Sequence, residues 1–252
     1  MPTVDVIIPT YNPTPILEKV IDNVLMQSYA EVNVILVDDA SHTGADILAK
    51  VSAKKNVTFY SHRQNKGGGY ARNTALEYAK SDYIAFCDAD DIWAPGKLDI
   101  QLKFMEEMGI SLSHSDIVPV REQGFDASRI KTRDKIDLRQ SLMTTQLYCS
   151  TVCMRNSVIN GNRFGTMRKR HPFKFWVSIL ENNIISYRVP DPDCYTNYMI
   201  REGSVSANKY ATAMFTILAY IFYPKNKFLA IWCLFLRLFF WKNSRSRILG
   251  KM

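Results

Sequence analysis

Short apolar runs alternate with segments of helical periodicity through the first half of the chain. The apolar runs predict strands at residues 4–9, 32–37, 57–61 and 83–87. The segments between and after them predict helices at 16–25, at 46–54, from a glycine-rich segment at 65–73 to about 80, and at 95–108, with a further strand at 110–120. Because such an alternation folds into a parallel sheet with right-handed crossovers, the predicted fold class is α/β.

Three carboxylates follow the apolar run at residues 83–87, namely Asp88, Asp90 and Asp91. The carboxyl end of such a strand is where open α/β sheets place their ligand crevices. Acids this close together repel one another, and a divalent cation such as Mg²⁺ or Mn²⁺ relieves that repulsion through oxygen ligands, often together with substrate phosphates. The sequence predicts a metal site here. The alternative is an acidic turn in which Asp91 caps the following helix.

Two more acids, Asp38 and Asp39, follow the strand predicted at residues 32–37. A carboxylate in that position can accept a hydrogen bond from a ring N–H, such as N3–H of uracil. Tyr11, in the turn after the first strand, offers an aromatic face on which a base can stack. We therefore expect one acid to bind a nucleotide base and the other to cap the helix that begins after Ser41.

Lys66 and Arg72 flank the glycines at residues 67–69. Glycines allow a backbone to approach a phosphate closely, and a helix N-terminus favours anions. The segment is not a P-loop, because no Gly-Lys-Ser/Thr follows, and it lacks the GxGxxG spacing of a dinucleotide-binding turn, which disfavours a dehydrogenase. A plain turn is the alternative.

The excess of positive charge is confined to the C-terminal tail. Residues 201–252 hold nine Lys or Arg and one Asp or Glu, so they account for the whole net charge of +8. The tail also contains apolar segments at residues 211–223 and 228–241, each shorter than the ~20 residues of a spanning helix. This combination predicts an anchor on an anionic membrane surface, or else helices that pack on the main domain. A nucleic-acid partner is not expected, because the tail is rich in Phe, Leu and Ile.

The cysteines and the N-terminus indicate the compartment. The five cysteines form no CxxC pair and no zinc-like cluster, so they are expected to be reduced packing residues. The chain enters its first strand without a secretory signal pattern. Both features favour a cytoplasmic protein.

Four segments together carry a resemblance that none of them carries alone. They are residues 6–12 (Val-Ile-Ile-Pro-Thr-Tyr-Asn), 37–41 (Val-Asp-Asp-Ala-Ser), 65–73 (with Asn-Lys-Gly and Ala-Arg-Asn) and 88–91 (Asp-Ala-Asp-Asp). In this order and spacing the chain resembles family 2 glycosyltransferases, which are inverting, nucleotide-sugar-dependent enzymes of the GT-A fold. The resemblance is close over residues 4 to about 100, weaker to about 206, and does not extend to the tail.

The resemblance implies a role for each matching residue. The nucleotide-sugar is expected to contact Thr10, Tyr11, Asn12, Asp38, Asp39, Lys66, Gly67, Arg72, Asp88 and Ala89. Within that set, Asp39 or Asp38 takes the uracil N–H. Asp88 faces the ribose or sugar, and Asp90, a catalytic residue of the implied site, reaches the Mn²⁺ or Mg²⁺ held by the diphosphate. With Asp91, a third candidate metal ligand, the segment is similar to the Asp-x-Asp-Asp of bacterial O-antigen glucosyltransferases.

The segment expected to carry the general base departs from the family. The family pattern resembles Arg-x-Glu-Asp-x-x-x-Trp, and this chain has His171 and Pro172 where the acids belong, followed by Trp176. Proline cannot accept a proton, whereas His171 can, with an ordinary pKa near ~6.5. We therefore expect His171 to be the base, or the chain to be catalytically impaired. Trp176 and Arg201 are the residues expected near the acceptor or the diphosphate.

The resemblance, together with the basic apolar tail, implies a hexosyltransferase that uses UDP-glucose or UDP-galactose and a saccharide on a lipid diphosphate, as in O-antigen or capsule synthesis. The expected parts are a nucleotide-sugar half at residues 1–93, an acceptor half at 94–206 and a membrane-surface tail at 207–252. The expected location is the inner face of the cytoplasmic membrane. The alternatives are a sugar-nucleotide-binding protein without activity and a sugar nucleotidyltransferase, although Thr10 to Pro13 is not a triphosphate loop.

Overall fold

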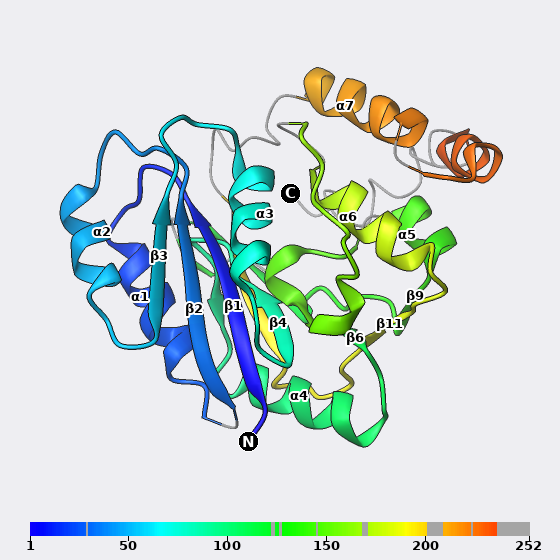
Figure 1. The fold of residues 1–252 in the computed structure, drawn as a ribbon. Coiled ribbons are helices and arrows are strands. Elements are labelled where there is room, and N and C mark those ends of the chain that lie inside the picture. The colour runs from blue at the N-terminus through cyan, green and yellow to red at the C-terminus, as the bar shows by residue number, and fades with distance from the viewer. Residues whose placement is uncertain are drawn as a thin grey trace.

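The structure is a computed structural model in which an eight-stranded sheet is covered by helices on both faces (Figure 1). It describes residues 1–28, 30–121, 124–125, 128–144, 146–167, 171–200, 209–222 and 224–235. The strand order is β3-β2-β1-β4-β10-β6-β11-β9. The first four strands in that order run parallel, which confirms the predicted α/β class.

The parallel strands and their helices form the half of the fold that the sequence predicts best. The strands are β1 (Thr3–Thr10), β2 (Glu31–Asp38), β3 (Val57–Ser61) and β4 (Tyr83–Phe86). The helices are α1 (Ile16–Leu25), α2 (Ala45–Ser52), α3 (Gly68–Tyr78) and α4 (Lys97–Glu107). Apolar side chains of α1 and α4 pack on one face of the sheet, and those of α3 pack on the other. Burial on both faces explains why these strands read as unbroken apolar runs.

Segments that follow α4 complete the same sheet. The added strands are β10 (Val152–Arg155), β6 (Leu112–His114), β11 (Ser186–Arg188) and β9 (Lys135–Ile136). Beside them lie α5 (Leu138–Thr144), α6 (His171–Leu180) and two 3-10 turns, η1 (Cys149–Thr151) and η2 (Asn156–Val158). Because β10 inserts antiparallel between β4 and β6, the predicted nucleotide and acceptor halves share one sheet.

A second, four-stranded sheet lies beside the acidic segment. Its order is β5 (Ile92–Trp93), β12 (Tyr195–Ile200), β7 (Asp116–Arg121) and β8 (Gly124–Phe125). The single strand predicted at residues 110–120 is therefore wrong, because β6 and β7 belong to different sheets. The chain changes sheet at Ser115, after which the buried Asp116 accepts hydrogen bonds from Arg129 Nε (2.8 Å) and Thr132 N (2.9 Å).

The tail helices have one buried face and one exposed face. Tyr220 of α7 (Lys209–Phe222) stacks on Phe173 of α6 with ring centroids 4.8 Å apart, and its hydroxyl donates to the Leu142 carbonyl. Ala230 and Cys233 of a following helix at 227–235 join the same buried cluster. Both tail helices therefore pack on α5 and α6, as one of the two alternatives predicted.

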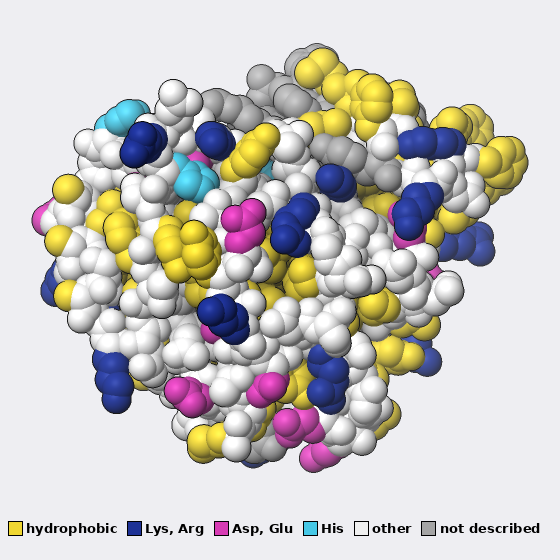
Figure 2. Space-filling model, viewed as in Figure 1, with side chains coloured by type: hydrophobic (Ala, Val, Ile, Leu, Met, Phe, Trp, Pro, Cys, Tyr) yellow, Lys and Arg dark blue, Asp and Glu magenta, His cyan; other side chains and the backbone are white. Residues whose placement is uncertain are grey.

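Large apolar side chains cover the other face of these helices. Figure 2 shows them gathered over α7 and its neighbour, at the upper right. The exposed residues are Met214, Ile217, Ile221, Phe222, Phe228, Ile231, Trp232 and Phe235. Their spacing of three and four residues places them on one side of each helix. Among the residues that the structure describes, no helix is long and apolar enough to cross a bilayer.

A buried histidine is expected to make stability depend on pH. Burial lowers the pKa of His114 to about 4, and its ring contacts Ser186 Oγ (2.7 Å) and the Arg133 carbonyl (2.9 Å). The unfolded chain has a histidine pKa near ~6.5, so protonation favours unfolding between these values. This contribution is complete above pH ~6.5, and about 3 kcal/mol is lost as the pH falls through about 4.

Urea unfolding between pH 7.5 and 4 measures this loss, with His114→Gln as the test variant. The variant should lose the part of the pH dependence that lies between about 6.5 and 4. His42 is exposed, so His42→Gln should keep the native profile. An unchanged slope in His114→Gln would assign the acid sensitivity to other groups.

Candidate active site

Asp39 organises the glycine-rich turn. It follows β2, its side chain is buried, and it accepts hydrogen bonds from the backbone N–H of Lys66 (3.0 Å) and Gly67 (2.5 Å). His62 Nδ1 lies 2.7 Å from the same carboxylate, and His62 Nε2 lies 2.9 Å from Thr74 Oγ1. Gly67 has φ +93°, a conformation that suits glycine. The carboxylate thus fixes the turn that starts α3.

Asp38 joins the loop after β2 to β3. Its carboxylate accepts hydrogen bonds from Ser61 Oγ (3.1 Å) and from both the backbone N–H (3.2 Å) and the hydroxyl of Ser41. Neither Asp38 nor Asp39 caps α2, which starts after Gly44, so that expectation is wrong. Both carboxylates are buried, and their hydrogen bonds hold the surrounding loops in place. A base ring that binds here would therefore meet a fixed surface.

The loop after β1 presents an exposed aromatic ring at the same edge. Tyr11 is 47% exposed, and its ring meets that of His42 edge-on at 6.1 Å. Asn12 ties this loop to the next one, because its N–H donates to Ser41 Oγ (2.7 Å) and its side-chain oxygen accepts from His42 N (2.8 Å). Thr10 Oγ1 is buried and has no hydrogen-bond partner in the described part of the chain.

A buried guanidinium connects the glycine-rich helix to the acidic segment. Arg72 of α3 forms an ion pair through Nη2 with Asp88, and its Nη1 donates to the Gly68 carbonyl (3.1 Å). The guanidinium also lies over the Phe164 ring, 5.6 Å from its centroid. Lys66 is more exposed and lies 5.9 Å from the Tyr70 ring centroid. Arg72 therefore sets the position of Asp88, and Lys66 supplies positive charge at the surface.

The first two acids of the segment remain accessible. The Asp88 side chain is 34% exposed, and Ala89 and Asp90 are half-buried. The Asp88 N–H donates to Ser150 Oγ (2.9 Å) of η1, which holds the backbone of the segment against the second half of the chain. Asp88 and Asp90 therefore lie at the carboxyl end of β4, as predicted.

The third acid, Asp91, is turned into the protein. Its side chain is 1% exposed, and its two oxygens accept hydrogen bonds from Ser150 Oγ (2.5 Å) and Met199 N (2.9 Å). Burial raises the pKa of Asp91, and the neighbouring Asp88 and Asp90 raise it further. Both oxygens accept hydrogen bonds inside the protein, so the structure disfavours the prediction of Asp91 as a metal ligand. The capping alternative is also wrong, because α4 starts after Gly96.

His171 contacts Arg72 where α3 and α6 meet. A Cβ on Gly69 would lie 2.5 Å from the Gly165 carbonyl oxygen and 3.0 Å from His171 Cβ, so glycine permits this approach. Arg72 Nη1 and His171 Nε2 are 2.9 Å apart. Because a guanidinium only donates, the Nε2 lone pair is the acceptor. His171 Nε2 therefore cannot take a proton from a substrate in this arrangement unless Arg72 releases it.

Pro172 and Trp176 have structural reasons for their positions. Pro172 is the second residue of α6, where the missing N–H costs no helical hydrogen bond. Trp176 is 3% exposed and packs edge-on against Phe86 and Phe164. The structure corrects the prediction that Trp176 contacts the acceptor, because its ring lies in the core. Arg201, the other predicted contact, lies outside the described residues.

Three residues of the site were missed by the sequence analysis. They are His62, Ser150 and Tyr198, whose ring lies 5.5 Å from that of Tyr148. Each acts on the site through a contact between segments that are distant in sequence. An isolated Ser or His carries no local signal of such a contact. The one local signal for Ser150 was its position as a polar residue within the mostly apolar run at 147–154.

The acidic segment fits a metal that is shared with a substrate. Within the described residues no cluster of three or more His, Cys, Asp or Glu side chains is arranged to hold a metal ion. Mg²⁺ in particular commonly binds through one or two carboxylates together with substrate phosphates. Asp88 and Asp90 provide such a donor set, and their oxygens are of the type that Mg²⁺ and Mn²⁺ prefer.

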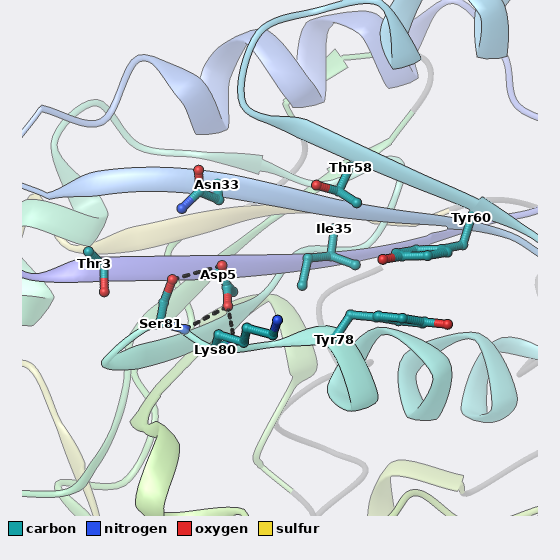
Figure 3. A pocket seen from close by; sticks show the side chains of 9 residues that line it. All are labelled: Thr3, Asp5, Asn33, Ile35, Thr58, Tyr60, Tyr78, Lys80 and Ser81. Carbon is teal, nitrogen blue, oxygen red and sulfur yellow. Dashed lines mark hydrogen bonds between the residues drawn. The ribbon is translucent and has the colours of Figure 1, made fainter.

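A cavity of about 410 Å³ opens elsewhere, on the face of the sheet beside the C-terminal end of α3 (Figure 3). Its buried acid, Asp5, already accepts hydrogen bonds from Lys80 N (2.6 Å) and from Ser81 N (2.9 Å). Tyr60 and Tyr78 stack at one end with centroids 4.0 Å apart. None of the predicted site residues lines this cavity.

Known proteins resemble this chain along most of its length. The family model for glycosyl transferase family 2 matches residues 5–172. TuaG of Bacillus subtilis, named for teichuronic acid biosynthesis, is 31% identical over 238 residues, covering 92% of this chain and 93% of TuaG. WfgD of Escherichia coli, named as a UDP-Glc:α-D-GlcNAc-diphosphoundecaprenol β-1,3-glucosyltransferase, is 29% identical over 207 residues, covering 82% and 81%.

The solved structures agree on the fold. S. aureus TarS residues 1–349, solved in complex with UDP-GlcNAc, matches with a TM-score of 0.73 and 20% identity. The match covers 99% of this chain and 76% of that one. At this identity the likeness supports the GT-A architecture and leaves the substrate open.

Proposed function

The chain belongs to glycosyl transferase family 2, and on this premise we propose that it transfers a hexose from a UDP-sugar to a saccharide carried on a lipid diphosphate. The observation that carries the proposal is the meeting of three features at one sheet edge. These are the exposed Tyr11, the turn held by Asp39, and the acid pair Asp88 and Asp90. The naming of WfgD supports UDP-glucose as donor and a lipid-diphosphate-linked GlcNAc as acceptor.

The proposed roles follow the positions of the side chains. The base stacks on Tyr11 above the surface that Asp38, Asp39 and Thr10 form, and its ring N–H is offered to one of the two acids. Lys66 and the Gly67 turn lie beside the diphosphate. Asp88 and Asp90 would hold Mn²⁺ or Mg²⁺, which supplies stabilisation of the charge that grows on the leaving phosphate. The acceptor hydroxyl attacks the anomeric carbon from the opposite face while the bond from that carbon to UDP breaks. UDP leaves, the configuration inverts, and the hydroxyl proton passes to a base.

Arg72 and His171 are proposed to hold Asp88 of the acid pair in position. Arg72 holds one oxygen of Asp88, so the other oxygen is oriented toward the diphosphate side. His171 supports Arg72 by accepting from Nη1 at 2.9 Å. To serve as the base, as the sequence suggests, His171 must exchange Arg72 for the acceptor hydroxyl when substrates bind.

The tail is proposed to hold the enzyme at an anionic membrane surface, on the cytoplasmic side. Its exposed apolar face is bordered by Lys225 and Lys227, and five more basic residues follow in the sequence beyond residue 235. Apolar insertion combined with basic charge is how interfacial helices bind. The opposite face is fixed to α6 through the stack of Tyr220 on Phe173, so the exposed face is the one that would meet the membrane.

One assay tests the transfer and the location together. Radiolabelled UDP-sugars are offered with GlcNAc-diphosphate-lipid in anionic or neutral vesicles, with Mn²⁺ or with a chelator. We expect transfer from one UDP-hexose, loss of at least ~100-fold on chelation, and sedimentation of the protein with anionic vesicles only. Failure to bind UDP would contradict the proposal, and equal sedimentation with neutral vesicles would contradict the charge-based anchor.

A second candidate function is a sugar-nucleotide-binding protein that does not catalyse transfer. One observation favours it, because Pro172 stands where the family has an acid and His171 Nε2 is already engaged by Arg72. UDP binding of ordinary affinity, with no transfer from any donor in the same assay, would favour this reading over the first.

A further inference from the structure

Two tyrosines on separate segments meet beside the acid pair. Tyr148 precedes η1 and Tyr198 lies on β12, and their rings are 5.5 Å apart at an angle of 56°. Both residues are half-buried. The pair is separate from the residues expected to contact the nucleotide.

The register of β12 fixes where the Tyr198 ring lies. Thr196 pairs with Trp93 and Asn197 with Ile92, so continuing this antiparallel register sets Tyr198 opposite Asp91. Thr196 Oγ1 donates to the Ser150 carbonyl (2.9 Å), which shows that this face of β12 lies on η1. Because side chains alternate along a strand, Tyr198 lies on the same face, toward Tyr148.

The same contacts bind both tyrosine-bearing segments to the acidic segment. Ser150, two residues after Tyr148, donates to Asp91, and Met199, next to Tyr198, donates its N–H to the same carboxylate. Burial raises the pKa of Tyr198, and the carboxylates of Asp88 and Asp91 raise it further. The Tyr198 hydroxyl therefore keeps its proton at neutral pH and can donate to a ligand.

The pair lies across the acid segment from the nucleotide side. Tyr11, Asp38 and Asp39 lie at the ends of β1 and β2, and Asp88 follows β4. Beyond β4 in the sheet comes β10, which η1 precedes directly. A molecule that approaches the sugar from the side opposite the nucleotide would therefore meet the tyrosines.

We propose that Tyr148 and Tyr198 form a platform for the sugar ring of the acceptor, an inference that rests on the proposed function. The apolar C–H face of a hexopyranose packs on tyrosine rings, and the Tyr198 hydroxyl is placed to hydrogen-bond one of the sugar hydroxyls. The platform sets which acceptor hydroxyl faces the donor sugar held by Asp88 and Asp90. The ligand class is a pyranose ring next to a diphosphate.

The test compares Tyr198→Ala, Tyr148→Ala and Tyr198→Phe with the native chain. Tyr78→Ala is the matched control, because Tyr78 belongs to a second tyrosine pair that lines the separate cavity. Acceptor KM, kcat and the dissociation constant of UDP are measured for each. We expect acceptor KM to rise at least about tenfold in both alanine variants, with UDP affinity within about twofold of native. Tyr198→Phe should recover most of the binding, because it keeps the ring.

A direct binding measurement separates this proposal from the proposed function. Saturation-transfer NMR with a short-chain, water-soluble GlcNAc-diphosphate reports contact whether or not transfer occurs. Loss of the signal in Tyr198→Ala but not in Tyr78→Ala supports the platform even in an inactive protein. The platform is overturned if the signal survives in both Tyr148→Ala and Tyr198→Ala. It is also overturned if folded Tyr198→Phe loses UDP affinity together with acceptor binding.

Discussion

Exchange of Asp91 for alanine should destabilise the fold by about 2–4 kcal/mol, because two buried donors lose their acceptor. Ser150 Oγ and Met199 N both donate to this carboxylate, and the side chain is almost fully enclosed. Each unsatisfied buried donor costs about 1–3 kcal/mol, less what relaxation recovers. Urea unfolding at pH 7.5 measures the change.

Asp91→Asn is the informative companion, because the amide oxygen can replace one acceptor. We expect it to lose about half as much stability as the alanine variant. Ser150→Ala removes the donor from the other side and should not add its full cost to Asp91→Ala, since the two residues share a hydrogen bond. Full additivity in the double variant would show that this bond contributes nothing.

Exchange of Asp90 for asparagine should reduce the transfer rate by about 10³-fold, which is about 4 kcal/mol of transition-state stabilisation. The reason is the loss of a carboxylate charge from the proposed metal donor set, while the size of the side chain is kept. Steady-state transfer at saturating donor and Mn²⁺ measures kcat, and titration of Mn²⁺ measures metal affinity.

Asp193→Asn, at an exposed acid in the loop before β12, is the control and should retain the native rate. An Asp90→Asn protein that keeps more than a tenth of the native kcat would show that this carboxylate is not a metal ligand. The comparison with Asp91 is more informative than either variant alone. Exchange of Asp90 should lower the transfer rate, whereas exchange of the adjacent Asp91 should lower the stability of the fold.

The sequence predicted the strands and the acid positions because their signals are local. An apolar run of β1 or β4 and the polar residue that ends it are adjacent, and buried parallel strands leave little ambiguity. The same logic placed Asp88 and Asp90 at the carboxyl end of β4. The strand at residues 110–120 was mispredicted because only Ser115 separates β6 from β7, and their change of sheet depends on partners far along the chain.

The burial of Asp91 and Trp176 could not be predicted from the residues next to them in the sequence. Asp91 differs from Asp90 only by its contacts with Ser150 and Met199, which are 59 and 108 residues away. Trp176 was expected near the acceptor or the diphosphate, yet its ring packs against the aromatic rings of Phe86 and Phe164. In both cases tertiary packing decides a role that the residue type leaves open.

The hydrogen bond from Met199 to Asp91 also bears on the order of events during synthesis. The strands β1 to β4 all precede residue 87, so their parallel pairing can form before β12 is synthesised. Arg72 and Ser150 can contact the acidic segment earlier, but the Met199 N–H reaches Asp91 only when β12 emerges, 108 residues later. The nascent chain would therefore have a nucleotide-binding edge before its acid pair is fully supported. Sugar-nucleotide chemistry would begin only once the acceptor side has also folded.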